Sequence, residues 1–195
     1  MIVDIINKKR LGRALTYSEL DFFFKGYLNG EVKDYQMSAL LMAICIKGMT
    51  DQEIFDLTKI FIDSGETLDF SAIEGIKVDK HSTGGIGDKT TLIIAPIVAA
   101  LGVPVVKMSG RGLGYTGGTI DKLESIKGFR TNLSDEEIFK QVKDIGVVVT
   151  GQTADLVPMD KAIYALRDVT GQQTIIMMLY WLLVKLNLMA PINNK

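Results

Sequence analysis

The chain has 195 residues, of which 47% are hydrophobic, and its formal net charge is −1. Such a chain can bury the core of one domain or of two small ones, and a charge near zero gives no bulk attraction to nucleic acid or to an anionic membrane surface. The single cysteine, Cys45, excludes an intrachain disulfide, and its apolar neighbours predict a packed, inert thiol.

Residues 1–66 are expected to form a small all-helical domain. Capping-box patterns, with a threonine three residues before a glutamate, open a helix at Thr16 and another at Thr50. Glycine and a preceding serine are suited to end such helices. The four expected helices run from Ile2 toward Gly12, from Thr16 to Gly30, from about Tyr35 to Lys47, and from Thr50 to Ser64-Gly65.

An α/β pattern follows over residues 67–155. Strands are expected near Ile76 (residues 75–78), from Val103 to Lys107 and from Val147 to Thr150; helices are expected from Thr91 to Leu101, after Thr119 and from a capping box at Ser134. A helix from Met159 to Arg167 is expected to return to the helical domain over residues 156–171, and residues 172–195 form an apolar tail. The predicted fold class is therefore α/β, with a small helical domain and the first part of a larger α/β domain that is expected to be truncated.

One turn-like segment combines hydroxyls, glycines, two lysines and the single histidine: Lys80-His81-Ser82-Thr83-Gly84-Gly85-Ile86-Gly87-Asp88-Lys89-Thr90-Thr91. It is expected to follow a strand and to precede a helix, so backbone N–H groups and a helix N-terminus would point at a bound group. This arrangement predicts a binding site for an oxyanion such as phosphate.

A second glycine-rich segment, from Ser109 to Thr119, follows the next expected strand, and two loops of this kind converge on one crevice. Gly112, Gly114 and Gly117 fit a dinucleotide-binding pattern, but no acidic residue ends a following strand about 20 residues on to bind a ribose. Residues 80–91 also fail as a P-loop, because Asp88 separates glycine from lysine. Dinucleotide binding and nucleoside triphosphate hydrolysis are therefore disfavoured.

Four long stretches occur in order: Lys80 to Gly85, Lys107 to Gly114, Thr116 to Glu124 and Tyr164 to Asp168. At this spacing they resemble the pyrimidine-nucleoside phosphorylase and thymidine phosphorylase family over about residues 1–171. The resemblance implies a pentosyltransferase of nucleotide salvage, which converts uridine, thymidine or deoxyuridine and phosphate reversibly to the free base and a pentose 1-phosphate. It also implies a homodimer through the helical domain, with both substrates in the cleft between the two domains.

The resemblance also assigns roles to single residues. The pyrimidine is bound by His81 and Arg167, and Tyr115 stands where most members have a histidine. No organic cofactor is implied, inorganic phosphate is the co-substrate, and some members bind potassium through backbone near Gly87 and Lys89. The residues that match the family's phosphate ligands are Lys80, Ser82, Thr91, Lys107, Ser109 and Thr119.

These residue types suit phosphorolysis on chemical grounds. Cleavage of the N-glycosidic bond builds positive charge on the sugar and negative charge on the leaving pyrimidine, while phosphate itself supplies the nucleophile. His81 can donate to a pyrimidine carbonyl, and Arg167 can brace that carbonyl with its fork of donors. Each also has an ordinary structural interpretation: a lone histidine as a hydrogen bonder, an arginine complementing a helix C-terminus, and the loop glycines as turn formers.

The chain also departs from the family pattern. Tyr115 keeps a hydroxyl but loses a titratable donor, and the ammonium of Lys89 can occupy the space of a potassium ion. After Gly171 the serine and lysine that contact the pyrimidine in the family have no counterpart. A frame change or a truncated gene would explain this loss of resemblance.

Three classes of function remain open: a pyrimidine-nucleoside phosphorylase, a transferase similar to anthranilate phosphoribosyltransferases, and a non-catalytic phosphate-binding fragment. The Lys80-His81-Ser82 opening disfavours the second class. The apolar run of residues 175–184 is shorter than the roughly 18 residues of a membrane span, and no signal peptide is recognised. A cytoplasmic protein without membrane or nucleic-acid partners is therefore expected.

Overall fold

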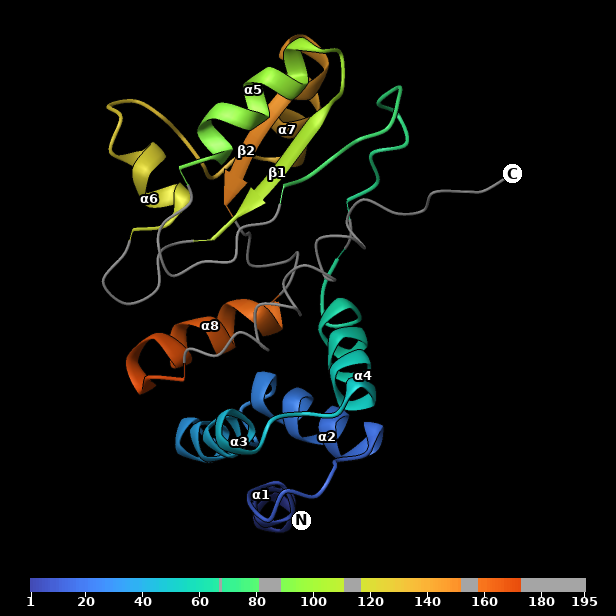
Figure 1. Ribbon diagram of the computed structural model, residues 1–195, viewed down its shortest axis with the longest axis vertical. Coiled ribbons are helices and arrows are strands. Elements are labelled where there is room, and N and C mark those ends of the chain that lie inside the picture. The colour runs from blue at the N-terminus through green and yellow to red at the C-terminus, as the bar shows by residue number, and fades with distance from the viewer. Residues whose placement is uncertain (67, 81–88, 111–116, 152–157, 173–195) are drawn as a thin grey trace. The chain divides into compact units, whose positions relative to one another are not determined.

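The computed structural model describes residues 1–66, 68–80, 89–110, 117–151 and 158–172. The chain divides into two compact units. The helical unit consists of Met1–Glu66 and the helix α8 (Pro158–Thr170), and the α/β unit is Thr67–Thr153. Figure 1 labels the elements of both units.

The helical unit begins with four helices: α1 (Ile2–Arg10), α2 (Tyr17–Leu28), α3 (Asp34–Lys47) and α4 (Asp51–Ile62). Both expected capping boxes are present: the hydroxyls of Thr16 and Thr50 accept the N–H groups of Glu19 and Glu53, whose carboxylates accept the threonine N–H groups in return. These reciprocal bonds satisfy helix-end donors that have no partner within the helix. All four helices confirm the sequence prediction, although α4 ends three residues before Gly65.

Aromatic and aliphatic side chains fill the core of this unit. The rings of Phe24 and Phe61 meet edge to face with centroids 5.7 Å apart. Helix α8 packs against α2 and α3, and the Gln172 side chain after it donates to the Ser38 carbonyl at 2.9 Å. Its fully buried large apolar residues include Leu20, Phe23, Phe24, Met37, Leu40, Leu41, Ile44, Leu57, Ile60, Phe61, Met159 and Ile163.

A buried ion pair joins α1 to α4. Lys9 Nζ lies 2.6 Å from Glu53 Oε1, with the two side chains 3% and 1% exposed. The same carboxylate oxygen accepts the backbone N–H of Leu15 at 2.8 Å. A buried pair is tolerated only when further hydrogen bonds satisfy its atoms, so Glu53 holds three segments of the helical unit together.

The α/β unit contains α5 (Thr91–Ala100), β1 (Val105–Ser109), α6 (Thr119–Glu124), α7 (Asp135–Ile145) and β2 (Val147–Gly151). The two strands are parallel, with Val105 opposite Val147 and Ser109 opposite Gly151. Val78 adds an isolated parallel bridge to Val105. Figure 1 shows α5 and α7 on opposite faces of this small sheet.

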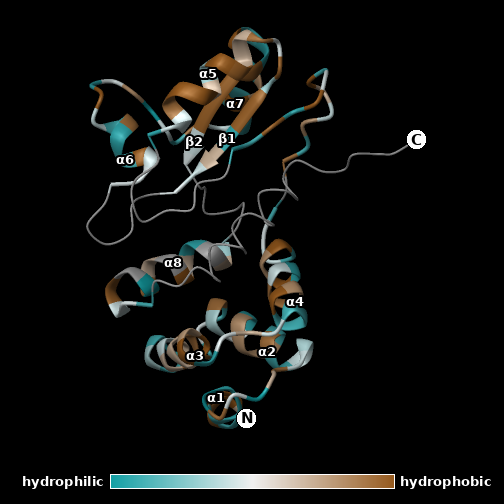
Figure 2. Cartoon of the chain, in the orientation of Figure 1, coloured by the Kyte–Doolittle hydropathy of each residue, from teal (hydrophilic) through white to brown (hydrophobic). Residues whose placement is uncertain are grey.

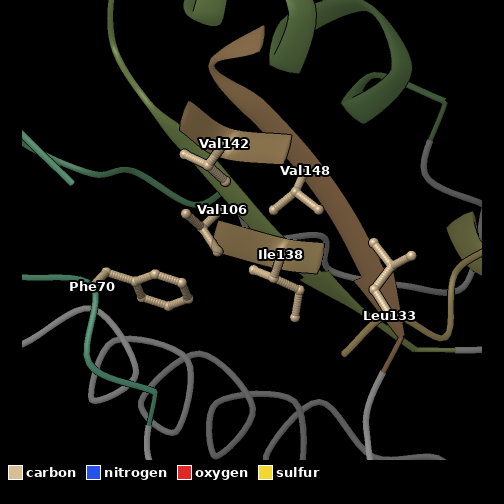
Figure 3. Packing of buried hydrophobic residues seen from close by; sticks show 6 residues of the cluster. All are labelled: Phe70, Val106, Leu133, Ile138, Val142 and Val148. Atoms are coloured by element: carbon tan, nitrogen blue, oxygen red, sulfur yellow. The ribbon is translucent and has the colours of Figure 1, made fainter. Parts of the chain in front are cut away.

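A compact apolar cluster lies between α7 and the sheet, as Figure 3 shows. Ile138 and Val142 of α7 meet Val106 and Val148, which are paired across β1 and β2 and so point to the same face of the sheet, while side chains alternate between faces along each strand. Phe70 and Leu133 complete the cluster. The same alternation directs Lys107 and Ser109 of β1 to the opposite face.

Three further elements differ from the sequence prediction: the strand near Ile76, the start of β1 and the end of α8. The expected strand near Ile76 is reduced to the bridge at Val78, and Ile76 is 79% exposed. Strand β1 begins two residues late, because Pro104 has no N–H for a ladder. Helix α8 extends past Arg167 to Thr170, where Gly171 with φ of +72° ends it.

The Cys45 side chain is half-buried, so the thiol is less enclosed than the sequence predicted.

Helix α5 is apolar along its length, as Figure 2 shows. Within the part of the chain that the structure describes, no helix is long and apolar enough to cross a bilayer.

Candidate functional site

The candidate phosphate-binding residues gather where chain segments leave one edge of the sheet. Val78 and β1 run parallel, so Lys80 and Ser109 both follow strand residues at the carboxyl edge. Helix α5 runs back against β1 and brings Thr91, its first residue, toward the same edge (Figure 1). Ligands of open α/β sheets bind at this edge.

Lys107 is the most deeply buried charged residue of this group. Its side chain is 1% exposed, and its Nζ donates to the Met108 carbonyl at 2.9 Å and lies 3.6 Å from Asp79 Oδ1. Removing an ammonium from water costs several kcal/mol unless polar groups compensate it. A buried cation at the end of a strand is therefore suited to attract and hold an anion.

Three buried hydroxyls accompany this cation. Thr91, Ser109 and Thr119 are less than one-tenth exposed and stand at the start of α5, the end of β1 and the start of α6. Hydroxyls donate hydrogen bonds to phosphate oxygens, and the first turn of α5 adds the positive end of a helix dipole. The combination favours binding of an anion.

The end of the second glycine-rich segment is fixed by α6. Asp121 Oδ2 accepts the backbone N–H of Gly118 at 2.8 Å, and the Lys122 ammonium donates to the carbonyls of Gly117 and Gly118. These contacts set the backbone that leads into Thr119. A fixed backbone lowers the entropy cost of binding a ligand there.

Several predicted site residues lie outside the described residues: His81, Ser82, Gly87 and Tyr115. Their roles stay predictions. Of the three that remain in the first segment, Lys80 is half-buried, Lys89 is exposed and Thr91 is buried. The described part of the chain therefore contains Lys80, Thr91, Lys107, Ser109 and Thr119 of the six predicted phosphate ligands.

Arg167 belongs to the helical unit rather than to the α/β unit. It lies in the last turn of α8, three residues before the helix ends, and its side chain is 3% exposed. Its position in the last turn agrees with favourable interaction with the helix C-terminus. The predicted contact with a pyrimidine stays a prediction.

Sequence reasoning missed Asp79. Its carboxylate Oδ1 accepts the backbone N–H of Lys80 at 2.6 Å and faces the Lys107 ammonium. An acidic residue is not an expected component of an anion site, which is why the residue types alone did not single it out. Its position directly after a strand and directly before Lys80 was the available signal.

Metal binding receives little support from the described residues. Among them, no group of three or more histidine, cysteine, aspartate and glutamate side chains is arranged to hold a metal ion. Of the two residues predicted near a potassium ion, only Lys89 is described, and it carries a positive charge that repels a cation. No step of the proposed chemistry depends on potassium.

Two family models match the chain. The model described as "Glycosyl transferase family, helical bundle domain" matches residues 3–65, and the model described as "Glycosyl transferase family, a/b domain" matches residues 74–184. The second match covers more than half of the chain. The chain therefore belongs to this glycosyl transferase family.

Curated relatives of the chain are pyrimidine-nucleoside phosphorylases. Those of Staphylococcus haemolyticus (strain JCSC1435) and Bacillus subtilis (strain 168) are 60% and 61% identical to it over 170 residues, and that of Geobacillus stearothermophilus is 56% identical. The match covers 87% of this chain and 39% of each relative. The chain thus spans about two-fifths of the length of the curated relatives it matches.

A solved structure shares the fold. The anthranilate phosphoribosyltransferase of Thermus thermophilus superposes with a TM-score of 0.73 over 93% of this chain and 54% of that one, at 23% sequence identity. At this identity the likeness concerns the fold alone. The predicted plan of a helical bundle with an α/β domain is confirmed.

Proposed function

We propose that the chain binds inorganic phosphate in its α/β unit and takes part in the reversible phosphorolysis of pyrimidine nucleosides. The observation that carries the proposal is the buried Lys107 ammonium, with buried hydroxyls at neighbouring strand and helix ends, in a chain about 60% identical to pyrimidine-nucleoside phosphorylases. Uridine, thymidine and deoxyuridine are the proposed nucleosides, with a pentose 1-phosphate as product.

The proposed chemistry assigns little covalent work to the protein. Phosphate attacks the anomeric carbon, the bond from that carbon to the pyrimidine nitrogen breaks, and its electron pair stays on the base. Lys107, Lys80 and the hydroxyls hold the phosphate near the sugar, which converts an encounter of two solutes into an oriented reaction. His81 and Arg167 donate to the pyrimidine as it gains negative charge, and Tyr115 is a further proposed contact of the substrate.

We further propose a cytoplasmic homodimer that associates through the helical unit. Val3 of α1 and Ile46 of α3 are exposed apolar side chains on helices that pack together, which supports an interface there. The net charge of −1 supports neither a nucleic-acid nor a membrane partner. Sedimentation equilibrium of the chain and of Ile46→Glu tests the dimer, and a monomeric parent chain would contradict it.

A second candidate function is phosphate binding without catalysis. It is favoured by the 39% coverage of the relatives, because groups that act on the base in them can lie beyond the matched region. The two candidates differ in what they require of the base site. The second requires nothing of His81 or Arg167.

One pair of measurements separates the candidates. Phosphate affinity is measured by calorimetry, and base release from uridine, thymidine and deoxyuridine is measured with and without phosphate. The phosphorylase proposal expects phosphate-dependent base release that His81→Gln lowers without changing phosphate affinity. Binding without any base release supports the second candidate, and absence of phosphate binding contradicts both.

A further inference from the structure

The residue Asp79 connects the two segments that form the candidate phosphate site. Val78 donates its N–H to the Pro104 carbonyl at 2.9 Å, and its own carbonyl accepts the Val106 N–H at 3.1 Å. These bonds form the parallel bridge between Val78 and Val105, and two residues that follow it, one on each segment, come within ion-pair distance. The neighbours brought together in this way are Asp79 and Lys107.

The Asp79 carboxylate acts on both segments through one oxygen atom. Oδ1 accepts the Lys80 backbone N–H at 2.6 Å, which fixes the first residue of the first segment. The same Oδ1 lies 3.6 Å from Lys107 Nζ, within ion-pair distance but longer than a hydrogen bond. The carboxylate therefore restrains the ammonium electrostatically.

This arrangement suits an ammonium that must be ready for a ligand. The Lys107 ammonium has three N–H donors. It can donate to the Met108 carbonyl, direct a second N–H toward Asp79 and still donate to a phosphate oxygen. A lysine side chain has large rotamer freedom, and fixing it before the ligand arrives lowers the cost of binding. The negative charge of Asp79 opposes an incoming anion, so any favourable effect must come from positioning.

We propose that Asp79 is a positioning residue for phosphate, which acts by holding the Lys107 ammonium and the start of the Lys80 segment in their binding geometry. This inference rests on the proposed phosphate site. It makes a prediction with an unusual sign: removing a negative charge near an anion site should weaken anion binding. Simple electrostatics predicts the opposite.

The test is phosphate affinity by calorimetry on the whole chain and on Asp79→Asn. Asp79→Asn is expected to weaken phosphate binding about tenfold, the lower end of the effect of supporting residues around bound metals. The matched control is Asp69→Asn, which removes the charge of another carboxylate in the same unit that accepts a local backbone N–H, here that of Ser71. The control is expected to leave the affinity unchanged.

A double-mutant cycle tests whether Asp79 acts through Lys107. In a Lys107→Ala background, Asp79→Asn is expected to lose most of its effect, because the ammonium to be positioned is gone. Full additivity would overturn the proposed route. Asp79→Glu is the second variant, to be used if Asp79→Asn does not fold; it keeps the charge, displaces the carboxylate by one methylene and is expected to give a smaller loss than the asparagine.

The outcomes separate this inference from the proposed function. Equal or tighter phosphate binding by Asp79→Asn, with Lys107→Ala weakened, overturns the role of Asp79 and leaves the phosphate site intact. Phosphate binding that depends on Asp79, without phosphorolysis of any nucleoside, supports the inference and contradicts the phosphorylase proposal. A chain that binds no phosphate overturns both.

Discussion

Five helices of the helical unit bury Phe23, Phe24 and Phe61 completely, whereas α5 of the α/β unit leaves Ile93 and Ile97 more than half exposed. In the helical unit α1, α2, α4 and α8 are amphipathic, and the more uniformly apolar α3 buries Met37, Leu40, Leu41 and Ile44. In the α/β unit, α5 is apolar on all sides, a pattern typical of helices covered in a larger fold. The unit that carries the phosphate-binding candidates is thus the less enclosed of the two.

The two units therefore differ in role: one contains the closed core, and the other contains the candidate phosphate-binding residues. The helical unit contains a closed core and a buried ion pair, so its interior tolerates little change. The α/β unit has two strands among its described residues, and its polar groups are aligned at one edge. Its helix α5 also leaves Ile93 and Ile97 exposed on an apolar face.

The sharpest test of the closed helical core is Glu53→Ala. This change leaves the Lys9 ammonium buried without its partner and removes a capping box, so a loss of about 3–5 kcal/mol is expected. Glu19→Ala is the matched control, because Glu19 has the same capping position and a lysine partner, but its ion pair is about 30% exposed. The control should lose about 1 kcal/mol in urea unfolding followed by circular dichroism. Equal losses would show that burial does not separate the two pairs.

In the α/β unit, helix α7 offers a buried and an exposed isoleucine whose effects on stability can be compared. Ile138 is fully buried in the cluster with Val106 and Val148, and Ile145 is 61% exposed on the same helix. Ile138→Ala is expected to destabilise the unit by about 2–5 kcal/mol, since it removes buried methyl groups and leaves a cavity. Ile145→Ala should change stability by less than about 0.5 kcal/mol. If both variants unfold alike, α7 does not pack on the sheet as described.

Lowering the pH should reduce the stability of the helical unit through protonation of Glu53. Burial raises the pKa of this carboxyl, but the hydrogen bonds from the Lys9 ammonium and from the Leu15 and Thr50 N–H groups outweigh it and hold the pKa below its ordinary value of 4.5. A lowered pKa in the folded state adds stability above pH 4.5, which is lost as the pH falls through the folded-state value. Unfolding curves between about pH 3 and pH 7 should show this acid limb, and Glu53→Gln should flatten it. An identical limb in the variant would assign it to other carboxyls.

The smallest effect on stability is expected on α5, where solubility should change instead. Ile93→Glu and Ile97→Glu place charge on an exposed apolar face. They should reduce self-association in light scattering, while the unfolding free energy changes by less than about 0.5 kcal/mol. Ala95→Glu, at a buried position of the same helix, should destabilise. Unaltered self-association in both surface variants would remove α5 from the associating surface.

Local signals made the helices predictable. Thr16, Thr50 and Ser134 each start a capping box with a glutamate three residues on, and all three boxes are observed. Strands depend on partners elsewhere in the chain, so the apolar pattern around Ile76 was misleading: only Val78 finds a partner there. The extension of α8 beyond Arg167 was missed because its end is set by Gly171.

The candidate site was predictable in its residues but not in its organisation. Lys107, Ser109 and Thr119 match phosphate ligands of the family that the sequence resembles, and the structure buries all three. The pairing of Asp79 with Lys107 arises from the parallel bridge between Val78 and Val105, which joins distant parts of the chain. No local pattern encodes such a contact. The sequence therefore predicts an anion as ligand but does not predict what positions the groups proposed to bind it.

The most direct test of the central claim is phosphorolysis by a fusion, in which residues 1–171 are joined to the remaining part of the Bacillus subtilis relative. Release of uracil from uridine is followed with and without phosphate, and ribose 1-phosphate is measured as the second product. We expect phosphate-dependent turnover by the fusion, loss of that turnover in Lys107→Ala, and much slower turnover by the 195-residue chain alone. A well-folded fusion that releases no base, or releases it at the same rate without phosphate, would contradict the account.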